Sequence, residues 1–211
     1  MTSTLNEKAA DAAKWSLLTE VLVKLVTPIT QLILARILTP EAFGVVATVT
    51  MVTSFADMFS DSGFQKYLVQ HDFSDKHDLY RNANVAFWTN MGVSILLWGL
   101  IAVFRDPLAE MVGNAGLGLV LVVACASLPM TSFSSIQLAL FRRELNFKSL
   151  LPIRTFVALI PLVVTLPLAL MGFDYWSLII GTIAGNLFNA VALTAKSEWK
   201  PKLYYSMQLF R

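Results

Sequence analysis

Charged residues are scarce in this sequence. They make up 14% of its 211 residues, against 56% hydrophobic residues, whereas soluble domains carry roughly 25% charged residues. A water-facing surface needs more polar side chains than this, so the composition excludes an ordinary soluble domain and indicates an integral membrane protein. The net charge of +2 is too small to imply a nucleic-acid partner.

Groups that carry catalysis or bind metals are also few. Cys125 is the single cysteine and lies in an apolar run, which excludes a disulfide framework and a Cys-based metal site. His71 and His77 stand in the stretch HDFSDKHD, which we interpret as an acidic and basic cytoplasmic loop rather than a metal site. The sequence contains no G-x-x-x-x-G-K-[ST], H-E-x-x-H or G-x-S-x-G pattern. We therefore expect no enzyme activity, no cofactor and no bound metal.

Long apolar runs, by contrast, are abundant. A transmembrane helix needs about 20 mostly apolar residues, and the stretches that qualify are about 15–38, 43–64, 83–104, 117–138, 152–172 and 175–195. The first is longer than the apolar region of a signal peptide and lacks a small-residue cleavage site, so we expect it to be retained. The sequence predicts an all-α, polytopic membrane helix bundle of six transmembrane helices at 15–195, flanked by cytoplasmic segments 1–14 and 196–211.

The cationic residues fall mostly on one side of these spans. Of the sixteen Lys and Arg residues, thirteen lie in or beside the termini and the connections 65–82 and 139–151, and only Arg36 and Arg105 lie on the other side. Connections rich in Lys and Arg stay in the cytoplasm. Both termini are therefore predicted to be cytoplasmic.

Local signals mark where two helices begin and end. In ILTPEAFG, Thr39 is placed to cap the second helix, with Pro40 at its first position and Glu41 in its first turn. This predicts a tight helical hairpin on the outer side. The pair Asp106-Pro107 is expected to end the third span.

Other signals concern how the helices pack. Gly181 and Gly185 in GTIAG have the spacing that lets two helices approach closely. Pro129, Pro161 and Pro167 each free a backbone carbonyl and are expected to bend their helices. We interpret most polar residues inside the spans as hydrogen-bonding links between helices; they are Thr27, Gln31, Thr48, Thr50, Thr53, Ser54, Ser127, Thr131, Ser134, Ser135 and Gln137.

Apart from Arg36 at the outer end of the first span, four charged residues lie inside the first two spans. Glu20 and Lys24 share a helix face because they are four residues apart. At 1.5 Å per residue, Lys24 lies roughly 15 Å and Asp57 roughly 12 Å from the cytoplasmic ends of their spans, so a Lys24–Asp57 contact is within reach. Two interpretations stay open: Glu20, Lys24, Asp57 and Asp61 form a structural network that sets helix register, or they line a functional cavity.

Three stretches carry a family likeness. LARILTPEAFGVVATVTMVTSFADMFSDSGFQKYLVQ resembles the N-terminal hairpin of bacterial oligosaccharide flippases of the Wzx-like polysaccharide transporter family, with its L-T-P-E-x-F-G turn, its acidic-glycine segment at 60–63 and its later glutamine, Gln70. NVAFWTNMGVSILLWGLIAVFRDPLAEMVG is similar to the third span and outer loop of that family. ALFRRELNFKSL is similar to its basic loop after span four.

The resemblance implies a member of the multidrug/oligosaccharidyl-lipid/polysaccharide exporter superfamily in the bacterial cytoplasmic (inner) membrane. Such proteins have twelve or more spans in two bundles around a central cavity. They move undecaprenyl-pyrophosphate-linked oligosaccharide to the outer leaflet for exopolysaccharide, O-antigen or capsule synthesis, alongside a polymerase and glycosyltransferases. Six spans correspond to one bundle, the N-terminal half, so we expect a fragment of a longer product, with 196–211 beginning a linker. Association of two copies is the alternative.

The resemblance to this family implies roles for the charged residues. Lys24 is hypothesised to line the cavity and hold the anionic pyrophosphate, with Glu20 and Asp57 neutralising it when the cavity is empty. Arg154, at the cytoplasmic mouth of span five, is either a first contact for the substrate or a positive-inside anchor. Two other functions stay open: a cation-coupled drug exporter that uses Asp57 or Asp61, and a truncated membrane protein without transport.

Overall fold

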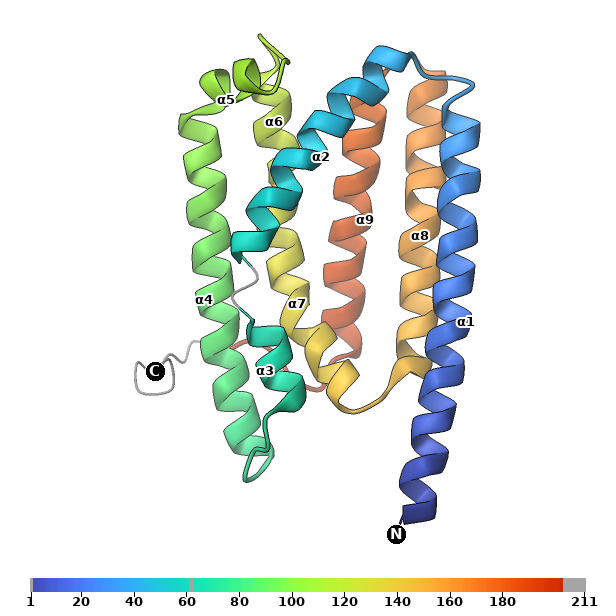
Figure 1. Cartoon of the computed structure of the whole chain (residues 1–211), viewed down its shortest axis with the longest axis vertical. Coiled ribbons are helices and arrows are strands. Elements are labelled where there is room, and N and C mark those ends of the chain that lie inside the picture. The colour runs from blue at the N-terminus through green and yellow to red at the C-terminus, as the bar shows by residue number, and fades with distance from the viewer. Residues whose placement is uncertain (1, 61–62, 203–211) are drawn as a thin grey trace.

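The chain is a bundle of helices in which successive long helices run in opposite directions. The computed structural model describes residues 2–60 and 63–202 (Figure 1). The helices in this part of the chain are α1 (Thr2–Leu34), α2 (Pro40–Ser60), α3 (Phe64–Gln70), α4 (Lys76–Val103), α5 (Arg105–Met111), α6 (Gly118–Cys125), α7 (Ser127–Arg143), α8 (Phe147–Leu170) and α9 (Tyr175–Lys196), and these residues contain no strand.

Each predicted span coincides with a long helix, or with the consecutive pair α6 and α7. Five segments are long and apolar enough to cross a membrane: Ala13–Leu34, Lys76–Val103, Gly118–Arg143, Phe147–Leu170 and Tyr175–Lys196. The predicted all-α, polytopic membrane bundle is thus confirmed. The 21-residue α2 is outside this set, so the count of six spans remains a prediction.

The basic end of the bundle is the end where α4 and α8 begin and α7 and α9 finish (Figure 1). The short helix α3 lies at this end, and α5 lies at the opposite end, which we call the outer end. Neither short helix was predicted, because each has only seven residues and shows no long apolar run. Asp75 caps α4 by accepting a hydrogen bond from the Asp78 backbone N–H at 2.7 Å, so α4 begins seven residues before the predicted span.

The fourth span is broken near its middle. Helix α6 ends at Cys125 and α7 begins at Ser127. Pro129 lacks the N–H that would bond to the Cys125 carbonyl, so a continuous helix is interrupted there. An interruption of the helix beside Pro129 is thus observed, and the bend expected there stays a prediction.

The turn between α1 and α2 forms as its sequence predicts. Thr39 Oγ1 accepts a hydrogen bond from the Ala42 backbone N–H at 3.2 Å, and α2 begins at Pro40 with Glu41 in its first turn. The two helices then diverge: α1 packs against α8, whereas α2 packs against α4, α6, α7 and α9 (Figure 1). The expectation that α1 and α2 lie side by side is wrong.

Small residues bring α8 and α9 together. Gly181 and Gly185 are both buried on the α9 face that meets α8. A Cβ at Gly181 would overlap the hydroxyl of Thr165 on α8, and one at Gly185 would lie 3.9 Å from the Val157 carbonyl oxygen. The close approach predicted from GTIAG is confirmed.

Candidate functional site

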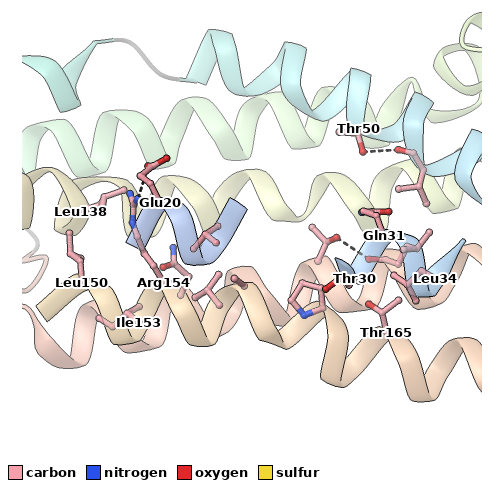
Figure 2. A pocket seen from close by; sticks show the side chains of 18 of the residues that line it. Glu20, Thr30, Gln31, Leu34, Thr50, Leu138, Leu150, Ile153, Arg154 and Thr165 are labelled. Carbon is pink, nitrogen blue, oxygen red and sulfur yellow. Dashed lines mark hydrogen bonds and ion pairs between the residues drawn. The ribbon is translucent and has the colours of Figure 1, made fainter. Parts of the chain in front are cut away.

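A cavity of about 510 Å³ opens where α1 and α2 diverge. Helices α1, α2, α7, α8 and α9 contribute its walls (Figure 2). Along α1 it extends from Glu20 to Leu34, which is roughly 20 Å at 1.5 Å per residue. It therefore runs lengthwise inside the bundle from near the basic end towards the outer end.

The end of the cavity nearer the basic end is charged. Glu20 Oε1 lies 3.7 Å from Arg154 Nη1, and Glu20 Oε2 lies 3.5 Å from Lys24 Nζ. Figure 2 shows Glu20 of α1 and Arg154 of α8 pointing towards one another. Two cations share one carboxylate, so this group, which we call the charged triad, has a net charge of +1.

The fold places Arg154 inside the wall rather than at a loop. Asn146 caps α8 by accepting a hydrogen bond from the Ser149 backbone N–H at 3.3 Å, so the helix begins five residues before the predicted span. Arg154 is then about 10 Å along α8. Its neighbour Ile153 is buried with Leu193 of α9, which holds this turn of α8 against the bundle. The Arg154 side chain is 32% exposed and the Glu20 side chain 49% exposed.

The rest of the cavity lining is mainly apolar, and its polar groups include four threonine hydroxyls. Thr30, Thr50 and Thr182 each donate to a backbone carbonyl four residues earlier, at 2.9, 2.7 and 2.9 Å. Because those protons are used within each helix, the remaining lone pairs can accept hydrogen bonds from a ligand. Thr165 is 1% exposed and its hydroxyl has no hydrogen-bond partner. The acceptors at Thr30, Thr50 and Thr182 suit a ligand that carries hydroxyl groups.

The amide side chains of the cavity differ in their contacts. Asn189 donates to Ser134 Oγ at 3.3 Å, and so links α9 to α7. Gln31 lies near the outer end of the cavity, close to Thr30 and Leu34 (Figure 2).

Some predicted polar links between helices are confirmed, because Ser134 and Gln137 of α7 meet Asn189 and Thr194 of α9. Thr48 of α2 instead meets Asn114 in the loop after α5. The hydroxyls of Thr50, Thr53 and Ser135 donate to carbonyls of their own helices.

The charged residues predicted from the sequence separate into two places. Lys24 pairs with Glu20 as expected, but its side chain is 78% exposed and it is not among the residues that line this cavity. Asp57 accepts a hydrogen bond from Thr131 Oγ1 of α7 at 3.4 Å. The Lys24–Asp57 contact is absent because α1 and α2 do not pack together. Asp61 lies outside the described residues.

A family model described as "Polysaccharide biosynthesis protein" matches residues 33–211. The chain belongs to this family. The match takes in four of the five helices that form the cavity, together with the whole turn before α2. The Wzx-like resemblance is confirmed.

Two relatives of this polysaccharide biosynthesis family cover nearly the whole chain. The succinoglycan biosynthesis transport protein ExoT of Rhizobium meliloti (strain 1021) is 28% identical over 209 residues, which are 99% of this chain and 42% of that protein. The lipopolysaccharide biosynthesis protein WzxC of Escherichia coli (strain K12) is 23% identical over 209 residues, 96% of this chain and 41% of that protein. The chain thus spans about two fifths of their length. No solved structure gives a significant match.

Several residues that line the cavity were not predicted from the sequence. Thr30, Thr165, Thr182 and Asn189 were not singled out, and Arg154 was placed at the mouth of its span. A signal was present: Arg154, Ala158, Pro161 and Thr165 recur every three or four residues on one face of α8, and all line the cavity. Only packing tells whether such a face meets lipid, a neighbouring helix or a cavity.

Proposed function

We propose that this chain forms part of a flippase that moves undecaprenyl-pyrophosphate-linked oligosaccharide across the bacterial cytoplasmic membrane. Its basic end lies in the cytoplasm in this proposal, and no catalysis is involved. The observation that carries the proposal is the charged triad at one end of a cavity otherwise lined by hydroxyl and apolar groups. The names of the two relatives, a succinoglycan transport protein and a lipopolysaccharide biosynthesis protein, support the substrate class.

The role of the triad follows from its charge. A pyrophosphate brings negative charge to a site with one excess positive charge. At 4 Å, with the effective dielectric constant of about 20 that suits partly buried groups, a unit pair attracts by about 4 kcal/mol. Arg154 offers paired N–H donors that match phosphate oxygens. We assign Arg154 and the exposed Lys24 to the headgroup, while Glu20 holds both cations in place when the site is empty.

The threonine hydroxyls have a separate role. Sugars present many O–H donors, and the free lone pairs of Thr30, Thr50 and Thr182 accept such bonds without charge. Neutral hydrogen bonds of this kind are individually weak, about 1 kcal/mol each. A transported ligand must leave as well as bind, so weak and distributed contacts suit transport.

The test is glycan export in cells that lack their own copy of the gene. The unmodified gene product and its Arg154→Ala, Arg154→Glu and Lys24→Ala variants are expressed to equal levels in the membrane. We expect Arg154→Ala to lower surface glycan about tenfold, equivalent to 1.4 kcal/mol, and Arg154→Glu to abolish it. Lipid-linked oligosaccharide should accumulate inside those cells. Arg105→Ala, whose partner is the exposed Asp106 at the outer end, is the matched control and should export normally.

Full export by both Arg154 variants would refute the assignment of Arg154. Full export by Lys24→Ala would refute only the assignment of Lys24 to the headgroup. Export of drugs rather than glycan, with loss of function in Asp57→Asn, would favour the cation-coupled exporter. Normal insertion with no transport by the unmodified product would favour a protein without transport.

A further inference from the structure

A second concave surface lies on another face of the bundle, between α4, α7 and α9. This groove has a volume of about 760 Å³ and shares no lining residue with the cavity of the charged triad. Its walls are mainly apolar and include Met91, Trp98, Phe133 and Val191. A groove of this composition inside the membrane-spanning part of the chain fits a hydrocarbon chain.

A basic pocket adjoins the groove at the basic end. It has a volume of about 450 Å³, and its lining includes the cationic side chains of Arg81, Lys200 and Lys202, together with His77. Lys200 lines both the pocket and the groove. Glu198 also lines the pocket, but its carboxylate lies 3.5 Å from Lys76 Nζ. An anionic group is therefore favoured next to the end of the apolar groove.

The two lysines are held in place by the chain that carries them. Residues 197–202 follow α9 and lie against the first half of α4. The Lys202 backbone N–H donates to Asn84 Oδ1 at 2.9 Å, and Trp88 Nε1 donates to the Lys202 carbonyl at 2.8 Å. Trp199 is 3% exposed and packs against Phe87 at a ring-centroid distance of 5.8 Å. These contacts fix the backbone of the pocket before any ligand arrives.

We propose that the groove and the basic pocket together bind an anionic phospholipid of the leaflet at the basic end. One acyl chain lies in the groove, and the phosphate lies over Lys200 and Lys202. We choose this occupant because of charge complementarity. A basic pocket between membrane helices attracts anionic headgroups, whereas a neutral lipid or a second apolar helix carries no negative charge to pair with its lysines. This proposal is independent of the flippase activity.

The experiment is lipid binding to the purified chain in detergent, followed by native mass spectrometry. The probes are phosphatidylglycerol and phosphatidylcholine with identical acyl chains. We expect phosphatidylglycerol to bind at least fivefold more tightly. Lys200→Gln should lower its affinity about fivefold, the effect of about one surface cation, and leave phosphatidylcholine binding unchanged. Lys196→Gln, four residues earlier and outside both surfaces, is the charge-matched control.

A second pair of variants tests the groove. Val191 is 61% exposed, so Val191→Trp should fill the groove without disturbing the core, and we expect weaker binding of both lipids. Val163→Trp, at a 67% exposed position of α8, is the control. Equal affinity for the two lipids, or equal losses in Lys200→Gln and Lys196→Gln, would overturn the proposal. Tighter binding of a polyprenyl phosphate than of phosphatidylglycerol would assign the groove to a carrier lipid instead.

Discussion

At the residue scale, Glu20 is the centre of the candidate site because its two oxygens contact cations on two different helices. For Glu20, this arrangement is compatible both with a structural role and with a role in the cavity. A Glu20–Arg154 pair joins α1 to α8, and it also positions a guanidinium at the end of a cavity. The pair is partly exposed, and such pairs contribute only about 0.5 kcal/mol to stability, so a purely structural role has a small effect.

Exchanging the two charges separates these interpretations. In the double variant Glu20→Arg with Arg154→Glu, the ion pair between α1 and α8 is kept, but the cation moves from α8 to α1. We expect the free energy of unfolding of the purified double variant to lie within about 0.5 kcal/mol of that of the unmodified protein. Glycan export by the double variant should stay at least tenfold lower than export by the unmodified protein. Recovery of both stability and export would show that the pair only sets helix register.

Arg143 illustrates a charged residue with a structural role. Its guanidinium Nη1 donates to the carbonyl oxygens of Leu68 and His71, at 2.9 and 2.6 Å, and the guanidinium carbon lies 4.9 Å from the centre of the Phe73 ring. It thus satisfies carbonyls at the end of α3 that have no partner within that helix.

Replacing Arg143 should loosen α3 without affecting the cavity. We expect Arg143→Met to lower the free energy of unfolding by about 2 kcal/mol, because hydrogen bonds to a charged group contribute about 1.5–3 kcal/mol. Faster backbone hydrogen exchange confined to α3 would locate the effect. Arg142→Met is the neighbouring control, and an equal loss of stability in both variants would contradict the assignment.

At the element scale, the contact of α8 with α9 depends on the absence of a single side chain. Gly181 faces Thr165 so closely that a methyl group has no room, whereas Gly92 of α4 has no atom within 4 Å of the position of a Cβ. The same substitution should therefore have opposite effects at these two positions.

Gly181→Ala should destabilise the protein by about 1–3 kcal/mol, the usual cost of overpacking. Gly92→Ala should be neutral or stabilise it by about 0.5–1 kcal/mol, because alanine loses less backbone freedom than glycine in a helix. Thermal unfolding of both variants in the same detergent measures the difference. Similar melting temperatures for the two would mean that α8 and α9 pack less tightly than described.

At the scale of the whole molecule, the predicted orientation can be tested with cysteines. The native Cys125 is fully buried, so it provides a silent background. Met111 at the outer end and Ser74 at the basic end are both exposed. We expect a membrane-impermeant maleimide to label Met111→Cys on intact cells, and Ser74→Cys only after the cells are opened. The reverse pattern would invert the predicted topology.

The size of the native product bears on the same scale. The curated relatives are more than twice as long as the matched segment, and a two-bundle flippase remains our proposal. A membrane protein of about twice this length would supply a second bundle to face the cavity. A stable product of 211 residues would favour the association of two copies, which cross-linking can measure.

Much of this architecture was determined by the sequence alone. Apolar runs of membrane length predict where the long helices lie, because burial of apolar surface and internally satisfied backbone groups leave few other folds in lipid. The capping pattern around Thr39, the proline at 129 and the glycines of GTIAG act through local geometry. Their consequences were therefore readable without tertiary contacts.

The partners of each helix were decided only by the tertiary structure. Sequence adjacency suggested that α1 packs on α2, but α1 packs on α8 instead. As a result, Glu20 forms an ion pair with Arg154, and Asp57 does not lie beside Lys24. Inside a membrane, helices associate through shape and a few polar contacts, and many apolar faces are equivalent in sequence. The position of the cavity depends on that choice of partner, which involves residues more than a hundred positions apart.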